Sequence, residues 1–369
     1  MKRPLVVARL GRVEYADGLR LMEAYQAARV AGLIPDTLLL LEHFPVLTFG
    51  RKIRRADILV SDAALAAQGI EVFETNRGGE VTFHGPGQLV GYPILDLSPD
   101  RRDVRRYVHD LEEVLIRTAG DLGVAAGRVE GLIGVWLGPD AVPATAGPSR
   151  KLAAIGVHLA RWVTSHGFAL NVNTDLSAFD LIVPCGIRDR GVTSLQRELA
   201  NAVPFEAVEA SAAKHFAAVF DREESLPAQP QASVQVQIVR PGRQGYELLA
   251  LHRSVARGDF WQPVTGHVEP GEPEGLAAAR ELGEETGLFS SVQALDYVHT
   301  FLAPEPGAPK LLREVAFAAL APAGFEPKLS AEHDAFAWVT ETDARARFPV
   351  AGLRRGASLA SRLAHQEAR

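Results

Sequence analysis

The stretch RGGEVTFHGPGQLVGYP, residues 77–93, decides how we interpret the first half of this chain. It contains five glycines, two prolines and one histidine, and little other side-chain bulk. Glycine has no Cβ, so it lets the main chain approach a ligand closely and adopt a positive φ. Such a run between short apolar segments is typical either of tight turns between strands or of one wall of a binding site. In a binding site its N–H groups could point at a carbonyl oxygen or an oxyanion.

Length and composition limit the class of protein. The chain has 369 residues, more than one ordinary domain, so we predict two domains. It is 47% hydrophobic and 23% charged with a net charge of -6, which indicates an ordinary globular protein without a nucleic-acid partner. The single cysteine excludes an internal disulfide and favours a reducing compartment.

The chain shows no sign of targeting to a membrane. Residues 1–18 start with basic residues but have no sustained apolar segment and no small-residue cleavage site. No apolar run approaches the roughly 18 residues of a membrane span. We therefore expect a cytoplasmic protein with no membrane partner.

The order of apolar patterns predicts a mixed α/β sheet domain. Strands are expected at 6–15, 37–50 and 131–138, and helices at 17–33, 62–68, 104–122 and 205–220. Residues 139–150 form a predicted loop, and 151–172 a predicted hairpin of two strands. The polar, proline-containing stretch that follows is typical of a linker, and VQVQIVR, residues 234–240, starts a new sheet. We predict a first domain at 1–222, a linker at 223–233 and a second domain at 234–369.

The only cysteine is the first candidate for chemistry. Cys185 lies in a loop between a proline and a glycine, after an apolar segment. A lone cysteine is usually a small buried residue, but it can be a nucleophile if a nearby cation favours its thiolate. Lys151 opens the otherwise uncharged segment KLAAIGV and is the candidate cation. An ordinary solvated lysine at a strand end is the alternative.

Six separate motifs then point to one family. They are LEHFPVLTFG, RGGEVTFHGPGQLVGYPILDL, GVW, KLAAIGV, HGFALNVNTDL, and IVPCGI followed by VTSL. In this order they resemble lipoyl(octanoyl) transferases, which move an octanoyl group from acyl carrier protein to lipoyl domains. The resemblance spans about residues 6–199, and it implies a fold like the catalytic domains of biotin and lipoate ligases. One departure is the loop between GVW and KLAAIGV, which is long here.

The resemblance also implies site residues and partners. Cys185 would be the nucleophile, and Lys151 would stabilise the thiolate as an ammonium or take a proton from the target lysine as an amine. An acyl channel would be lined by Arg77, Gly78, Gly79, Glu80, Val81, Thr82, Phe83, His84, Ala154, Ile155, Gly156, Gly167, Phe168 and Ala169. Partners would be octanoyl-acyl carrier protein, the lipoyl domains of 2-oxoacid dehydrogenases and the glycine cleavage H protein. The transfer itself needs no cofactor.

Several roles in this first domain stay open. His84 could donate to the developing oxyanion or hold the thioester carbonyl, or it could be a core histidine. We interpret His43 and His166 as structural. The basic runs at 51–55 and 101–106 either dock the acidic carrier protein or form a solvated face. The alternative for the whole domain is an ATP-dependent ligase, which would not need Cys185.

A second motif, GHVEPGEPEGLAAARELGEETGL, occupies residues 266–288. It matches the pattern G-x5-E-x7-R-E-U-x-E-E-x-G-U at every fixed position, where U is a bulky aliphatic residue. This is the Nudix box, and it implies an α/β/α sandwich and a hydrolase of diphosphate bonds. Glu281, Glu284 and Glu285 lie on one face of a helix, so a divalent cation, Mg²⁺ or Mn²⁺, is needed to offset their charge.

The resemblance to Nudix hydrolases assigns further roles. Glu332 would be a further metal ligand or a base, and the Gly266 carbonyl would be another ligand. Arg280 and Glu272 would lie behind the ligands and orient them. The flanks at 260–272 and 329–339 resemble bacterial dihydroneopterin triphosphate diphosphatases, and nucleoside triphosphates and dinucleoside polyphosphates stay equally open. Phe260 and Trp261 either stack on a flat ring or belong to the core. The sequence thus predicts a bifunctional fusion, or else a transferase or ligase with a non-catalytic, ligand-sensing Nudix module.

Overall fold

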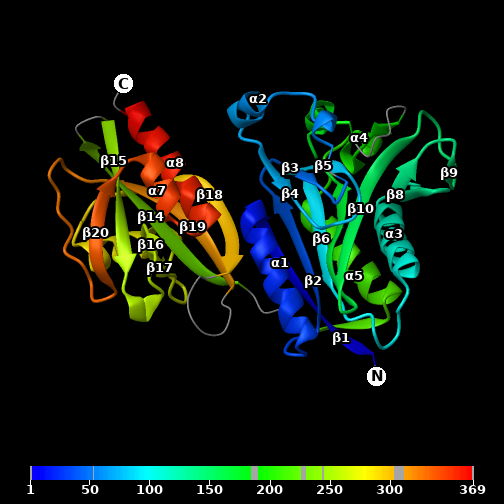
Figure 1. The fold of residues 1–369 in the computed structure, drawn as a ribbon, viewed down its shortest axis with the longest axis horizontal. Coiled ribbons are helices and arrows are strands. Elements are labelled where there is room, and N and C mark those ends of the chain that lie inside the picture. The colour runs from blue at the N-terminus through cyan, green and yellow to red at the C-terminus, as the bar shows by residue number, and fades with distance from the viewer. Residues whose placement is uncertain are drawn as a thin grey trace. The chain divides into compact units, whose positions relative to one another are not determined.

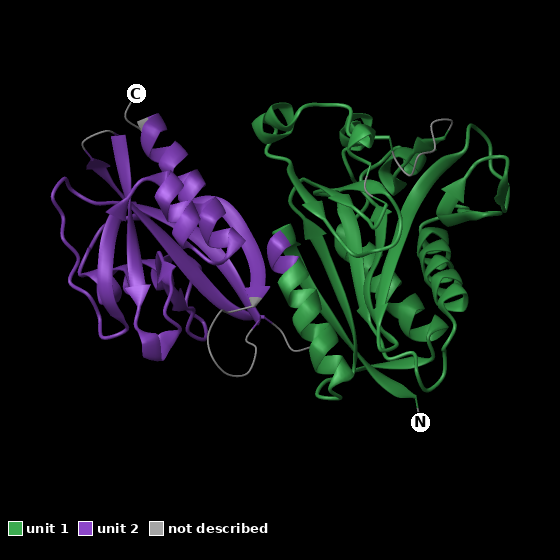
Figure 2. Ribbon diagram, in the orientation of Figure 1, with its two compact units in different colours: residues 1–15, 19–228 green, residues 16–18, 229–369 purple. Residues whose placement is uncertain are grey.

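The structure of this chain is a computed structural model that describes residues 2–52, 54–183, 190–225, 230–242, 245–302 and 311–367. The chain divides into two units, Met1–Tyr15 with Leu19–Ala228 and Ala16–Gly18 with Gln229–Arg369 (Figure 2). We call them the N-terminal and the C-terminal unit. Within the described ranges, no helix is both long enough and apolar enough to cross a membrane.

A large mixed sheet organises the N-terminal unit (Figure 1). Its strands follow the order β13-β1-β2-β6-β11-β10-β8-β7-β9, with β12 paired to β10. The strands are β1 (Arg3–Val13), β2 (Asp36–His43), β6 (Gln88–Ile94), β7 (Gly127–Val129), β8 (Leu132–Leu137), β9 (Ala141–Val142), β10 (Arg150–Ala160), β11 (Val163–Asn171), β12 (Gly191–Val192) and β13 (Arg222–Ser225). β1 pairs in parallel with β2 and β13, and β10 with β12, whereas the pairs of β6 with β2 and β11 and of β10 with β11 are antiparallel, which confirms the predicted mixed sheet.

Helices cover both faces of this sheet. They are α1 (Tyr15–Val30), α2 (Asp62–Ala67), α3 (Val104–Asp121), α4 (Leu195–Leu199) and α5 (Phe205–Val219), with short 3-10 helices η1 (Arg55–Asp57) and η2 (Leu176–Leu181). Leu111 of α3 and Phe216 of α5 share one apolar core with Leu38 and Leu40 of β2. Figure 1 shows α1 on the opposite side of the sheet from α3. Because both of its faces are covered, β2 is buried along nearly all of its length.

The apolar run at 37–50 is not one strand, as the sequence predicts, but two strands in different sheets. β2 belongs to the large sheet, and β3 (Val46–Phe49) lies in a small sheet between β4 (Glu71–Glu74) and β5 (Val81–His84). Proline has no N–H to donate to a ladder, so Pro45 is where the chain leaves one sheet for the other. The small sheet has its own core, in which Leu47 and Phe83 meet Phe179.

The glycine stretch forms β5, a turn and β6, so it provides both turns and walls. Gly87 sits in the turn with φ of +80°, and a Cβ there would meet Asn173 O at 2.5 Å. At Gly91 a Cβ would lie 2.1 Å from the Phe168 ring, so only glycine lets that ring pack against β6. The close approach of β6 and β11 therefore depends on the missing side chain.

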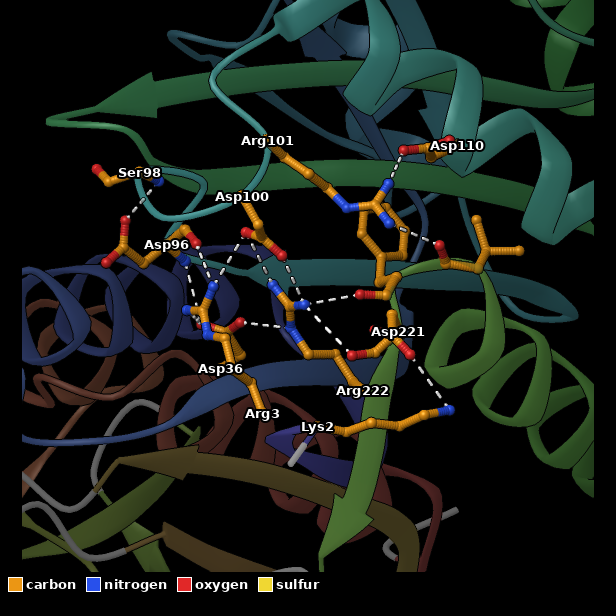
Figure 3. Close-up of polar contacts among 12 residues, drawn as sticks. Lys2, Arg3, Asp36, Asp96, Ser98, Asp100, Arg101, Asp110, Asp221 and Arg222 are labelled. Carbon is orange, nitrogen blue, oxygen red and sulfur yellow. Dashed lines mark hydrogen bonds and ion pairs between the residues drawn. The ribbon is translucent and has the colours of Figure 1, made fainter.

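An ion-pair network ties the two ends of the N-terminal unit together (Figure 3). The buried Asp36 carboxylate accepts from Arg222 Nε at 2.9 Å, Arg29 Nε at 2.9 Å and Arg3 Nη2 at 3.1 Å. Arg222 also donates to Asp100 at 2.9 Å. These contacts hold β13, the last strand of the unit, against β1 and β2.

The C-terminal unit is an α/β/α sandwich, as predicted. Its sheet has the order β16-β15-β14-β19-β18, with β17 paired to β14 and β20 to β15. The strands are β14 (Gln231–Gly242), β15 (Gly245–Arg253), β16 (Trp261–Gln262), β17 (Val264–His267), β18 (Val292–Leu302), β19 (Leu311–Leu320) and β20 (His333–Val339). The helices are α6 (Glu274–Thr286), α7 (Glu341–Arg347) and α8 (Ala351–Glu367), with the 3-10 helix η4 (Val255–Arg257). One core packs α6 on the sheet, and a second core packs α7 and α8 on it.

The predicted linker at 223–233 overlaps two strands. Residues 223–225 belong to β13 of the N-terminal unit, and residues 231–233 begin β14 of the C-terminal unit. The division between the units falls after residue 228, not at the predicted domain start, 234. The polar composition of this stretch suggests an exposed linker. However, the strand β13 begins with Arg222, which is buried by its pairing with Asp36 and Asp100.

Candidate functional site

A cavity of about 610 Å³ opens beside the large sheet of the N-terminal unit. Its walls come from the segment before β5 and from β5, β6, β10 and β11. Every channel residue predicted from the sequence lines it except Phe83, and Lys151 lines it too. The sequence-distant segments 77–84, 154–156 and 167–169 therefore meet around one space.

Phe83 is wrong as a channel residue. Val81, Thr82 and His84 of β5 line the cavity, whereas Phe83 does not. The Phe83 ring packs edge-on against Phe179 at 5.7 Å in the core of the small sheet.

Lys151 stands at the start of β10 in an aromatic and cationic setting. Its Nζ lies 4.6 Å from the centroid of the Trp136 ring, and the Arg190 guanidinium lies 5.6 Å from the same centroid. β12 pairs Val192 with Lys151, so the chain just after residues 184–189 runs beside this lysine. Cys185 itself lies outside the described residues.

The long loop between β8 and β10 is attached to the same place. Asp140 forms an ion pair with Arg190 and accepts a hydrogen bond from Ser149. Gly138 N donates to Thr145 Oγ1 at 2.7 Å, which closes the loop on itself. This loop thus anchors the residue that follows the segment containing Cys185.

Arg77 is a buried cation that braces the glycine segment. Its Nη2 donates to Thr48 O at 2.6 Å and to Thr48 Oγ1 at 2.8 Å, and its Nη1 donates to Gly78 O at 3.1 Å. A Cβ at Gly156 would come within 2.8 Å of Gly78 O, so the glycine segment lies directly on β10. Arg77 and Gly156 together fix one wall of the cavity.

Three histidines cluster at or behind the cavity, and all are neutral at pH 7. Burial lowers the pKa of His43 to about 4 and, together with the Arg77 charge, lowers the pKa values of His84 and His166 to about 3. Tyr92 donates to His43 Nε2 at 2.7 Å, and His166 Nε2 donates to Asn76 Oδ1 at 2.8 Å. His84 and His166 line the cavity, whereas His43 does not.

The basic run at 101–106 divides into buried and exposed residues. Arg101 is only 8% exposed, pairs with Asp110 and lies over the Phe220 ring at 4.9 Å, so it stabilises the fold. Arg105 and Arg106 are exposed on the first turn of α3. Val104, on the same turn, lines the cavity, so these two arginines stand near its edge.

The C-terminal unit has its own cavity, of about 530 Å³. It is lined by Gly266, Arg280, Glu281, Glu284, Glu285 and Glu332, so the residues predicted for the metal site and Arg280 meet there. Glu272 does not line the cavity. It accepts two hydrogen bonds of 3.0 Å from Arg280. Phe260 lines the cavity, whereas Trp261 packs in the core beside α8.

Arg280 holds the first of the helix glutamates. Its Nη1 donates to Glu281 at 2.7 Å and approaches Glu284 at 3.4 Å, and its Nη2 donates to His267 O at 2.9 Å. The Glu281 carboxylate packs on Gly266, where a Cβ would lie 1.9 Å from Glu281 Cδ. Glycine at 266 is therefore a steric requirement for this carboxylate position.

Glu285 and Glu332 are held differently. Glu332 accepts from Arg253 and Arg257, each at 3.1 Å. Glu285 is 5% exposed, and its Oε2 has no hydrogen-bond partner among the described residues. Burial, and then the charges of Glu281 and Glu332, raise the pKa of Glu285 well above its usual range.

These carboxylates do not form a preassembled metal site. Among the described residues, no group of three or more His, Cys, Asp or Glu side chains is arranged to hold a metal ion. Glu281 is paired with Arg280 instead, and Glu332 with Arg253. The donor set still fits a hard divalent cation, because all its ligands are oxygens and no described residue is a hydrogen-bond partner of the buried Glu285 Oε2.

Comparison with known proteins gives the family. Residues 14–217 match the lipoyl protein ligase A/B catalytic domain, and residues 229–357 match the NUDIX domain. The chain belongs to the lipoyl protein ligase A/B family. Its second domain is a Nudix domain, and both resemblances given by the motifs are thereby confirmed.

The named relatives of this chain show which kind of enzyme each of its two domains resembles. The octanoyltransferase of Myxococcus xanthus is 51% identical over 350 residues, which cover 95% of this chain and 97% of the relative. The octanoyltransferase of Acidobacterium capsulatum is 53% identical over 223 residues, 58% of this chain and 89% of the relative. A solved Escherichia coli dihydroneopterin triphosphate pyrophosphohydrolase is 24% identical with a TM-score of 0.32, over 37% of this chain and 99% of that one. This family member is thus an enzyme with an acyltransferase domain of the octanoyltransferase type and a Nudix hydrolase domain.

Sequence reasoning missed part of the cavity of this family member. Tyr15, Tyr92 and Trp136 line it, yet each lies in an ordinary apolar segment and reads as core. Arg190 was likewise indistinguishable from other charged loop residues. A usable signal was the GVW motif, whose Trp136 pairs with Lys151 of KLAAIGV in the sheet.

Proposed function

We propose that the N-terminal unit transfers an octanoyl group from octanoyl-acyl carrier protein to a lysine of a lipoyl domain, through a thioester on Cys185. The observation that carries this proposal is the position of Lys151 and Trp136 at the cavity wall, with the Arg190 guanidinium beside the same Trp136 ring. Arg190 and β12 directly follow the segment that contains Cys185, and β12 pairs with Lys151, so two cations lie where the chain leaves that segment and would favour a thiolate.

The cavity suits an eight-carbon chain. Its walls include Val81, Val90, Ile155 and Phe168, and glycines keep them close together. Each methylene moved from water into such a site contributes about 0.8 kcal/mol. An octanoyl chain would therefore gain roughly 5 kcal/mol, enough for selective binding over short acyl groups.

The chemistry follows in two half-reactions. The Cys185 thiolate attacks the carrier thioester, a new C–S bond forms, and the carrier thiolate leaves and takes a proton from water. The target ammonium then loses a proton to water, and its nitrogen forms a C–N bond to the octanoyl carbon while the bond to Cys185 breaks. The second nitrogen proton also goes to water, and the returning thiolate is stabilised by the Lys151 ammonium.

Mass spectrometry of the intact chain tests the first half. Incubation with octanoyl-acyl carrier protein should add one octanoyl group, which Cys185→Ala abolishes and Lys151→Met strongly slows. An exposed lysine of α5, changed as Lys214→Met, is the matched control and should not alter the rate. A Cys185→Ser chain that still transfers octanoate with ATP would instead support the ligase alternative.

We also propose that the C-terminal unit hydrolyses a diphosphate bond with Mg²⁺ or Mn²⁺. Glu281, Glu284, Glu285, Glu332 and the Gly266 carbonyl would hold the cation. A bound cation would polarise the diphosphate and activate water. Arg280 keeps Glu281 pointed into the cavity, and Arg253 and Arg257 do the same for Glu332. Those arginines can turn to phosphate oxygens once a cation neutralises the glutamates.

Glu285→Gln tests this second activity against a non-catalytic sensing role. In the full chain it should weaken Mn²⁺ binding by titration calorimetry and abolish hydrolysis of the best substrate among dihydroneopterin triphosphate, nucleoside triphosphates and dinucleoside polyphosphates. The exposed Glu326, changed as Glu326→Gln, is the matched control. Binding of these compounds without hydrolysis by the unaltered chain would favour the sensing module.

A further inference from the structure

Behind His84, a chain of hydrogen bonds runs to the strand that carries Lys151. His84 Nδ1 lies 2.7 Å from Gln88 Oε1, and Gln88 Nε2 lies 2.9 Å from Asn171 Oδ1. Asn171 Nδ2 in turn donates to Thr193 O at 2.9 Å. Thr193 N donates to Lys151 O at 2.9 Å, so the chain ends on β10.

Two main-chain carbonyl groups fix the direction of this chain. A carbonyl oxygen can only accept, so the donors to Phe83 O and Thr193 O must be the amide nitrogens of Gln88 and Asn171. Gln88 must then turn its Oε1 toward His84. Because that oxygen is an acceptor, the hydrogen in this bond belongs to His84 Nδ1.

The other ring nitrogen of His84 is therefore an acceptor. Burial lowers the pKa of His84 to about 3, so the ring is neutral and carries only the hydrogen on Nδ1. Nε2 keeps its lone pair, and it has no hydrogen-bond partner within the described part of the chain. The ring is only 7% exposed and lines the octanoyl cavity. With Nε2 as an acceptor, the ring would not donate from this nitrogen to an oxyanion, which was one of the roles left open for His84.

We propose that His84 Nε2 accepts a hydrogen bond from the attacking amine of the target lysine, and that Gln88 and Asn171 are positioning residues that hold the ring in the accepting tautomer. The inference rests on the proposed octanoyl transfer. An N–H held by Nε2 turns the lone pair of the amine toward the octanoyl carbon as the C–N bond forms. His84 does not keep the proton, which passes to water as described above. The first half-reaction has no N–H nucleophile, so it does not need this contact.

Nitrogen NMR of the full ¹⁵N-labelled chain tests the tautomer without any activity. The His84 ring, identified by its loss in His84→Gln, should show a protonated Nδ1 and an unprotonated Nε2 at pH 7. Gln88→Leu should remove the acceptor of Nδ1 and mix the two tautomers. Gln68→Leu, at an exposed glutamine after α2, is the matched control and should leave the signals unchanged. A protonated Nε2 in the unaltered chain would overturn the proposal.

The two half-reactions, measured separately, test the role. With Gln88→Leu, octanoyl transfer from the isolated acyl-enzyme to a lipoyl domain should fall at least about tenfold, while acylation by octanoyl-acyl carrier protein changes less than about twofold. His84→Gln should retain more of the second step than His84→Asn, because only the longer side chain places an oxygen where Nε2 lies. Equal loss in both half-reactions refutes the inference. If the unaltered chain gains no octanoyl group at all, the proposed function fails first, and the NMR result still decides the tautomer.

Discussion

Replacing Asp36 by asparagine is the most direct test of how the N-terminal unit is held together. The Asp36 carboxylate is 1% exposed and accepts a hydrogen bond from Arg29. It also accepts hydrogen bonds from Arg3, Arg222 and the Asp96 main-chain N–H (Figure 3). Asparagine has nearly the same shape but no charge, and its amide NH₂ would face an arginine. Arg222 is 3% exposed and would keep only Asp100 as a counter-ion.

The expected loss of folding free energy in Asp36→Asn follows from the burial of this ion pair. Removing one partner from a buried ion pair typically costs about 3–5 kcal/mol, because the other charge stays in a poorly solvated place. Asp100 remains beside Arg222 and Arg3, so we expect the lower end, about 3 kcal/mol. The exposed pair of Arg55 and Asp62 is the contrast: Asp62→Asn should cost less than about 1 kcal/mol.

Hydrogen exchange followed by mass spectrometry on the full chain measures this without separating the units. A loss of about 3 kcal/mol corresponds to roughly a hundredfold faster exchange in peptides from β1, β2 and β13. Peptides from β18 and β19 in the C-terminal unit should exchange at unchanged rates and serve as the internal control. If Asp36→Asn and Asp62→Asn give the same small effect, the buried ion-pair network does not stabilise this unit as we reason.

Three further predictions concern pH, metal and partner. The pKa values of His43, His84 and His166 are lower in the folded chain than the ordinary value of 6.5, so the unfolded chain binds more protons below that pH, and stability is lost as pH falls from about 6.5 toward about 4. Each histidine contributes about 1.4 kcal/mol of stability per pH unit in this range, and Glu209, whose pKa burial raises to about 7, offsets one of the three. The free energy of unfolding of the N-terminal unit in urea should therefore be several kcal/mol lower at pH 5 than at pH 7. Equal stability at both pH values would contradict this prediction. Gly266→Ala, which places a Cβ 1.9 Å from Glu281 Cδ, should reduce diphosphate hydrolysis at least about hundredfold and leave octanoyl transfer intact, and retention of hydrolysis would show that the Glu281 position is not needed. Arg105→Glu with Arg106→Glu should raise KM for octanoyl-acyl carrier protein several-fold at low salt, while Arg117→Glu on the same helix should not; an unchanged KM would remove the docking role of α3.

Local patterns in the sequence were enough for most helices and for many residues of both sites. α3 starts where Asp103 caps it, and α6 carries the Nudix glutamates with the predicted spacing. Local sequence determines such features because capping and helical spacing involve residues only a few positions apart. The glycines of 77–93 predict either tight turns or a wall of close-packed main chain, and the structure contains both.

Other features were fixed only by contacts between distant segments. Phe83 and His84 are neighbours in sequence but face opposite sides of β5, and the pairing of β5 with β3 decides which side is the cavity. In the sequence Arg101 cannot be told apart from its exposed neighbours, whereas in the fold it is buried against Asp110 and Phe220.

The sequence by itself thus determined which chemistry this protein carries, because its motifs bring together residue types with few other uses. The tertiary structure alone decided how those residues are oriented. Trp136 reaches Lys151 across a strand pair, and Gln88 and Asn171 set the tautomer of His84 from two different strands. Orientation depends on strand pairing and burial over long sequence separations, and no local pattern encodes it.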